Sequence, residues 1–114
     1  MGLFSTEKTE QEYEDMARKY LLDGETLIKA GKNWEDWVAL TNKRLMIVGI
    51  DHDAKIRTFK HLTSVPLSTI VEVNLLYADR TEFIDIVTLK RKHPLRMNAE
   101  KTKSFSDAIL NQIL

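Results

Sequence analysis

The sequence predicts an α+β domain in which seven antiparallel strands form a partly open barrel, with an additional N-terminal helix and a C-terminal helix that caps the barrel. Near both ends of the 114-residue chain, apolar residues recur at the spacing of one helix face. Between these segments the apolar residues alternate with polar ones or form short runs, which is typical of strands. Consecutive strands joined by tight turns pair antiparallel, and a sheet of seven must curl to bury one face.

The N-terminal helix is expected over residues 9–21. Thr9 and Glu12 have the spacing of a capping box, and Asp23-Gly24 ends the helix. Its apolar stripe consists of Tyr13, Met16, Ala17, Tyr20 and Leu21. We therefore divide the chain, within one domain, into a helical extension over residues 1–24 and a barrel over residues 25–114.

The strands are expected where turn-forming residues separate short apolar or alternating segments. They cover residues 25–31, 36–41, 44–50, 55–62, 70–77, 82–89 and 93–98. Asn42-Lys43 forms a two-residue turn because asparagine tolerates a positive φ, and Pro66 interrupts pairing between the fourth and fifth strands. The C-terminal helix spans residues 99–114, with Asn98 as its cap and Phe105 plugging one end of the barrel.

Three stretches in this order carry a resemblance to a known family. Gly24-Glu25-Thr26-Leu27 opens the first strand, Thr41-Asn42-Lys43-Arg44-Leu45 joins the second to the third, and Val65-Pro66-Leu67-Ser68-Thr69-Ile70 follows the fourth. Together with the C-terminal helix, they make the chain resemble the bacterial pleckstrin-homology-like family and, more distantly, the GRAM domains. The resemblance implies a partly open seven-stranded barrel capped by a helix, a role without enzymatic activity, and a tendency to form homo-oligomers.

Composition excludes several classes of function. The chain has no cysteine, so it has neither disulfides nor thiolate nucleophiles. Its 17 basic and 17 acidic residues sum to zero, which gives no general attraction to nucleic acid, and no nucleic-acid partner is expected. The longest apolar run, Leu45 to Ile50, is too short to span a bilayer, and no signal peptide is apparent. A cytoplasmic location is therefore expected.

No catalytic site, metal site or cofactor is predicted. The three histidines, His52, His61 and His93, follow no recognisable catalytic motif. Asp51-His52-Asp53 is the only local cluster of metal-ligand types, and adjacent residues on an extended turn point apart. The four glycines form no phosphate-binding loop.

A basic segment near the C-terminus is the best candidate for binding anions. It spans residues 90–96 and contributes Lys90, Arg91, Lys92 and Arg96. Each such side chain near an anionic membrane strengthens binding by ~1 kcal/mol. The alternative interpretation is a solvated hairpin tip.

Two other basic stretches invite a lipid-headgroup interpretation. Lys43 and Arg44 at the second turn either contact a headgroup or keep a hairpin turn solvated. In the first hairpin, the carboxylates of Glu35 and Asp36 offset the positive charge of Lys29 and Lys32. They therefore disfavour binding of a polyanionic headgroup.

The second and third strands carry apolar side chains on both faces, whereas a barrel has a single interior. We expect the outer face, with Trp37, Met46, Val48 and Ile50, to be covered by the N-terminal helix or by a second copy of the chain. Charge supports contact between the chain ends, because residues 1–24 hold six acids and three bases, whereas residues 90–103 hold six bases and one acid.

Two functions follow from these features. The first is a non-catalytic interaction module that forms homo-oligomers and binds another, unknown protein. The alternative is a peripheral module that makes weak contact with anionic membranes through residues 90–96.

Overall fold

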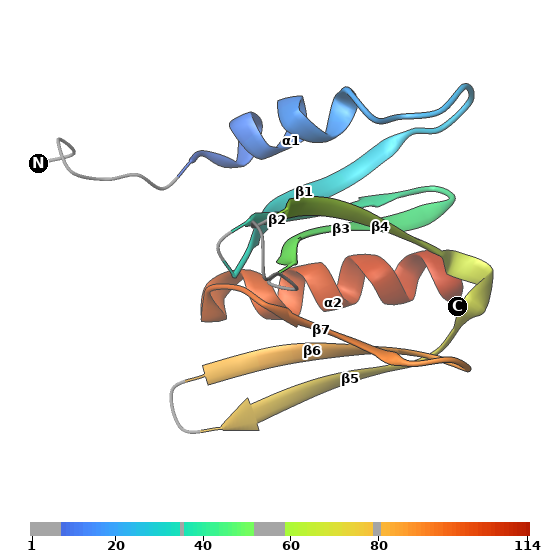
Figure 1. Cartoon of the computed structure of the whole chain (residues 1–114). Coiled ribbons are helices and arrows are strands. Elements are labelled where there is room, and N and C mark those ends of the chain that lie inside the picture. Colours follow the sequence, from blue (N-terminus) through green and yellow to red (C-terminus); the bar gives the residue numbers. More distant parts are fainter. Residues whose placement is uncertain (1–7, 35, 52–58, 79–80) are drawn as a thin grey trace, which may run out of the picture.

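The computed structural model describes residues 8–34, 36–51, 59–78 and 81–114 (Figure 1). Within these residues two α-helices frame seven strands, which confirms the predicted α+β class. In chain order the elements are α1 (Glu10–Arg18), β1 (Leu27–Asn33), β2 (Asp36–Thr41), β3 (Arg44–Asp51), β4 (Phe59–Pro66), the 3₁₀ helix η2 (Leu67–Thr69), β5 (Ile70–Ala78), β6 (Thr81–Thr88), β7 (Lys92–Arg96) and α2 (Ala99–Ile113).

The strands form two antiparallel sheets, one with the order β1-β2-β3-β4 and one with the order β5-β6-β7. Helix α2 lies between the two sheets, and α1 lies on the outer side of the larger sheet (Figure 1). The molecule is therefore layered as helix, sheet, helix, sheet. This arrangement gives the larger sheet two covered faces.

The inner core lies between the sheets and α2. Phe105 is 1% exposed there, as expected for a residue that closes the barrel. Asn98 caps α2 by accepting a hydrogen bond from the backbone N–H of Glu100, which confirms the predicted helix start. The buried residues of this core are Val38, Leu40, Leu45, Val65, Ile70, Ile84, Ile86, Leu95, Met97, Phe105 and Ile109.

A second core lies between α1 and the outer face of the larger sheet. All six residues of β2 are buried, because its side chains point alternately into the two cores. The capping box of Thr9 and Glu12 is confirmed, although α1 ends at Arg18, earlier than predicted. The buried residues of this outer core are Tyr13, Ala17, Ala30, Trp37, Ala39, Met46 and Val48.

Strand β4 differs from the prediction of residues 55–62. It continues to Pro66, which pairs with Arg44, while residues 52–58 lie outside the described part of the chain. Proline is tolerated there because β4 is an edge strand and Pro66 is its last residue. Its fixed φ then leads directly into η2.

The turn between β2 and β3 lies where it was predicted, but for a different reason. Within the described residues Trp34 is the only non-glycine residue with a positive φ, so Asn42 does not use the left-handed region. Instead, the Thr41 hydroxyl accepts hydrogen bonds from the backbone N–H groups of Lys43 and Arg44. The Asn42 side chain accepts from Thr26 N–H at 2.8 Å and ties the turn to the chain before β1.

Candidate functional site

A groove of about 480 Å³ lies where the end of β4, η2 and the start of β5 meet the β6–β7 hairpin. We call it the hairpin groove. Its volume is in the range of ligand-binding clefts. It is lined by Thr63, Ser64, Val65, Pro66, Ser68, Thr69, Val71, Thr88, Leu89, Lys90, Arg91 and His93.

Most residues that line the hairpin groove have polar side chains and none has a carboxylate, although apolar atoms make up most of the exposed surface of the groove. Lys90 and Arg91 are exposed cations on the hairpin, and neither forms an ion pair within the described residues. The lining also presents the hydroxyl groups of Thr63, Ser64, Ser68, Thr69 and Thr88. Those of Thr63, Ser64 and Ser68 can donate a hydrogen bond to an anion, whereas the Thr69 and Thr88 hydroxyls donate to backbone carbonyls.

Local hydrogen bonds fix the backbone at the two cationic residues. The Thr88 hydroxyl accepts from the backbone N–H groups of Lys90 and Arg91, both at 3.3 Å, and donates to the Arg91 carbonyl at 3.1 Å. On the opposite wall, the Thr69 hydroxyl donates to the Pro66 carbonyl at 2.7 Å and closes η2. The backbone of both walls is therefore shaped by side chains that also line the groove.

His93 adds a titratable group to the groove. Partial burial lowers its pKa below the usual 6.5, and the positive charge of Arg91 lowers this pKa further. The imidazole is therefore neutral at pH 7 and can accept or donate one hydrogen bond. The fixed positive charge of the groove at that pH comes from Lys90 and Arg91.

Two apolar side chains stand on the rim of the groove. Leu89 is 90% exposed in the turn of the hairpin. Val71 is 57% exposed because the register of β5 shifts between Ile70 and Glu72, leaving Val71 as the extra residue of a β-bulge. Apolar and cationic side chains therefore line the same groove.

The structure separates the four residues of the predicted basic site. Lys90 and Arg91 line the groove, whereas Lys92 is exposed outside it. Arg96 lies at the far end of β7, where its guanidinium stacks 5.2 Å from the Trp34 ring centroid and 5.7 Å from that of Phe83. The groove residues of β4 and η2 were missed because they are distant in sequence from the hairpin.

Arg44 is neither a headgroup ligand nor a solvated turn residue, so the prediction about it was wrong. Its side chain is 13% exposed and binds Glu25 through two hydrogen bonds of 2.9 and 3.0 Å. It also donates to the carbonyl of Tyr20 and to the hydroxyl of Ser64. Arg44 therefore fastens the segment between α1 and β1 to the barrel.

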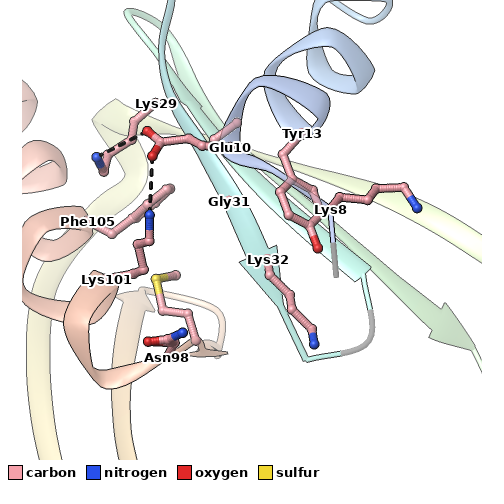
Figure 2. A pocket seen from close by; sticks show the side chains of 11 residues that line it. Lys8, Glu10, Tyr13, Lys29, Gly31, Lys32, Asn98, Lys101 and Phe105 are labelled. Carbon is pink, nitrogen blue, oxygen red and sulfur yellow. Dashed lines mark hydrogen bonds and ion pairs between the residues drawn. The ribbon is translucent and has the colours of Figure 1, made fainter. Parts of the chain in front are cut away.

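A second, much smaller pocket of about 60 Å³ lies between α1, β1 and the start of α2 (Figure 2). The carboxylate of Glu10 forms ion pairs there with Lys29 at 3.8 Å and Lys101 at 3.3 Å. Such a volume holds about two water molecules. The expected attraction between the chain ends therefore occurs within one chain. The two ion pairs of Glu10 hold α1 against β1 and α2.

The predicted interface residues Trp37, Met46 and Val48 are covered by α1 and are 4%, 0% and 7% exposed. The side chain of Ile50 lies outside the described part of the structure. The sequence left open whether the N-terminal helix or a second copy of the chain covers this face. In the structure the chain's own helix α1 covers these three residues. Self-association stays a prediction.

Within residues 8–34, 36–51, 59–78 and 81–114, no three histidine, cysteine, aspartate or glutamate side chains gather as metal ligands do. His52 and Asp53 of the weak local cluster lie outside the described residues. Among the described helices, none has the length and apolar character needed to cross a bilayer.

No protein-family model matches the sequence, and no curated protein matches it. Solved structures similar to it include two from Shewanella species. A pleckstrin homology domain from Shewanella amazonensis SB2B has a TM-score of 0.68 at 17% identity, over 97% of this chain and 93% of that one. A DUF1696 family protein with a pleckstrin-homology domain from Shewanella loihica PV-4 has a TM-score of 0.69 at 19% identity, over 95% of this chain and 96% of that one. Both likenesses concern the fold, over nearly the whole chain.

Proposed function

Because the chain has the pleckstrin-homology-like fold, we propose that it is a non-catalytic binding module whose ligand-binding surface is the hairpin groove. The single observation that carries this proposal is the groove itself, a cleft of about 480 Å³ with two cations and five hydroxyls but no carboxylate in its lining. A fold does not determine a function, so the proposal rests on the chemistry of this cleft.

The ligand carries a negatively charged group. Lys90 and Arg91 supply positive charge, and the hydroxyls of Thr63, Ser64 and Ser68 supply donors that can share the same acceptor oxygens. A neutral or cationic ligand would leave this positive charge uncompensated. The groove contains no arrangement of nucleophile, base and orienting acid, which is why we assign binding and not catalysis.

The test is a titration of the full chain with inorganic phosphate at neutral pH, followed by amide NMR spectra. We expect saturable shifts confined to the amides of residues 68–71 and 88–93, because these surround the cations. Sodium chloride of equal ionic strength should not reproduce them, since screening alone is independent of the groove.

Matched variants test whether the phosphate shifts depend on the two cations of the groove. Lys90→Gln with Arg91→Gln should abolish the phosphate shifts, whereas Lys8→Gln with Lys32→Gln removes the same charge from exposed sites outside the groove and should preserve them. Shifts that chloride reproduces, or that persist in the groove variant, would contradict the proposal.

Self-association and binding of another protein are the other functions expected from the sequence. The apolar surface that motivated self-association is covered by α1 at Trp37, Met46 and Val48. We therefore base the proposed function on the groove, which does not require a second copy of the chain.

A further inference from the structure

We propose that Trp34, Phe83 and Arg96 form a docking site for an acidic segment of another protein, in which a carboxylate binds the Arg96 guanidinium and an apolar side chain packs on the Trp34 ring. We call these three residues the arginine cluster. Phe83 and Arg96 are paired across β6 and β7 at the end remote from the hairpin turn. The inference therefore concerns a different surface from the hairpin groove and does not depend on the proposed function.

Trp34 has an unusual backbone conformation. Its φ is 55°, in the left-handed region, which a bulky side chain enters only at a steric cost. Two hydrogen bonds join this turn to β7: the Trp34 N–H donates to the Arg96 carbonyl at 2.9 Å, and the Asn33 side chain accepts from the Arg96 N–H at 2.8 Å. A glycine at position 34 would allow the same backbone without the steric cost. The connection between the two sheets therefore does not explain the tryptophan.

The Trp34 ring does not serve the interior of the molecule either. It is 47% exposed and belongs to neither the inner nor the outer core. The ring centroid lies 6.0 Å from that of Phe83 and 5.2 Å from the guanidinium carbon of Arg96. Tryptophan and arginine are among the residues that contribute most to binding at protein–protein interfaces. A half-exposed tryptophan kept in a strained backbone therefore indicates a contact with a partner.

Arg96 determines the charge of this partner. The residue is exposed, and within the described residues its side chain forms no ion pair. Its guanidinium lies against two aromatic rings, 5.2 Å from the Trp34 centroid and 5.7 Å from the Phe83 centroid, so cation–π contacts orient it. An oriented guanidinium binds a carboxylate through two parallel hydrogen bonds. The chemistry of the cluster therefore favours an aspartate or glutamate of the partner.

Two described carboxylates lie close to the cluster in sequence, and neither neutralises Arg96. Asp36 forms an ion pair with Lys60 at 3.0 Å. Glu82 precedes Phe83 in β6 and points to the opposite face of the sheet, because side chains alternate along a strand. The charge of Arg96 is therefore left for a carboxylate from another molecule.

A protein segment fits this cluster better than a nucleic acid does. The cluster has a single cation, whereas nucleic-acid sites neutralise several phosphates at once. The chain as a whole has a formal net charge of zero, which gives no general attraction to a polyanion. An acidic protein segment needs only one carboxylate at Arg96 and one apolar side chain on Trp34.

The test is a titration of the full chain with a short synthetic peptide of glutamate and leucine, followed by amide NMR spectra and tryptophan fluorescence. We expect saturable amide shifts at residues 33–34, 83 and 95–97, which surround the cluster. The emission should change because Trp34 is half-exposed, whereas Trp37 is only 4% exposed. A peptide with glutamine in place of glutamate should bind about tenfold more weakly, since it lacks the charged partner of Arg96.

Two variants separate binding from folding. Trp34→Gly removes the ring and suits the positive φ, so it should weaken peptide binding by about tenfold and leave the thermal unfolding midpoint nearly unchanged. Arg96→Gln should weaken binding by a similar factor, because the exposed guanidinium is lost.

The matched controls remove the same kinds of side chain from sites outside the cluster. Lys92→Gln removes an exposed cation from the same strand as Arg96. Tyr77→Ser removes an aromatic ring that is 72% exposed on β5, next to Glu82 and on the opposite face of the sheet from Phe83. Both controls should bind the peptide like the unmodified chain.

The outcomes decide the assignment. Peptide binding that is lost in Trp34→Gly and Arg96→Gln, but retained in the two controls, supports it. Absence of saturable shifts, binding unaffected by the two variants, or a large fall in both unfolding midpoints would overturn it. A single-stranded oligonucleotide that shifts the same amides when the peptide does not would also overturn it. The phosphate shifts at the hairpin groove test the proposed function separately, because they report on other residues.

Discussion

Deletion of residues 1–22 will produce a domain that aggregates or fails to fold. The deletion removes α1 and exposes the outer face of β2 and β3, including Trp37, Met46 and Val48. Burial of one large apolar side chain contributes ~1.5–3 kcal/mol, so loss of Tyr13 and its neighbours removes roughly 5 kcal/mol from a domain whose total stability is about 5–15 kcal/mol. The measurements are recovery in the supernatant after centrifugation and thermal unfolding monitored by circular dichroism.

A pair of point variants controls for the missing chain length. Ala17→Asp places a carboxylate at a position that is 0% exposed against the sheet, and it should resemble the deletion. Gln11→Asp places the same group on the exposed face of α1 and should fold normally. A deleted chain that is monomeric and as stable as the full chain would show that α1 is not the cover.

Replacement of Arg44 by alanine will lower the free energy of unfolding by about 3–5 kcal/mol. Glu25 is bound by Arg44 and also accepts hydrogen bonds from the Leu22 N–H at 2.8 Å and the Thr41 hydroxyl at 2.6 Å. Its side chain is 0% exposed, so removing Arg44 leaves a buried carboxylate without its cation. Urea unfolding of Arg44→Ala against the unmodified chain measures the loss.

The pH dependence of stability gives an independent check on this ion pair. Hydrogen bonding to Arg44 is the main cause that lowers the Glu25 pKa from 4.5 to about 2. A carboxyl with a lowered folded pKa stabilises the fold above pH 4.5, and this contribution, about 3 kcal/mol, is lost as the pH falls toward 2. In Arg44→Ala only the hydrogen bonds from Thr41 and Leu22 still lower this pKa, and burial opposes them, so the loss on acidification should be smaller.

Arg18→Ala is the matched control, because Arg18 pairs with Glu14 at 3.4 Å with its side chain 53% exposed. Exposed pairs of this kind contribute less than about 1 kcal/mol. An effect of Arg44→Ala no larger than that of Arg18→Ala would contradict the role given to Arg44.

Local patterns in the sequence predicted most of the fold. The capping box of Thr9 and the helical spacing around Phe105 are local signals, and both helices formed where these signals lie. The two-sided apolar character of β3 correctly required a cover on its outer face. Whether α1 or a second copy of the chain covers this face depends on tertiary packing, and the sequence left this question open.

The site was harder to predict because it depends on contacts between distant segments. The sequence proposed Lys90 and Arg91 as anion ligands, which stays a prediction, but the groove that they line also needs Ser68 and Thr69 from a distant segment. Arg96 was grouped with them by proximity in sequence, although β7 carries it to the other end of the strand. Arg44 was misread because its partner, Glu25, is nineteen residues away.

Amide hydrogen exchange of the full chain, with and without inorganic phosphate, tests the central claim most directly. The claim is that the hairpin groove is the surface through which this module binds its ligand. We expect added protection in residues 63–71 and 88–93 and none in α1 or the β1–β2 hairpin. Protection confined to α1 or the β1–β2 hairpin, with the groove segments exchanging as in the free chain, would contradict it.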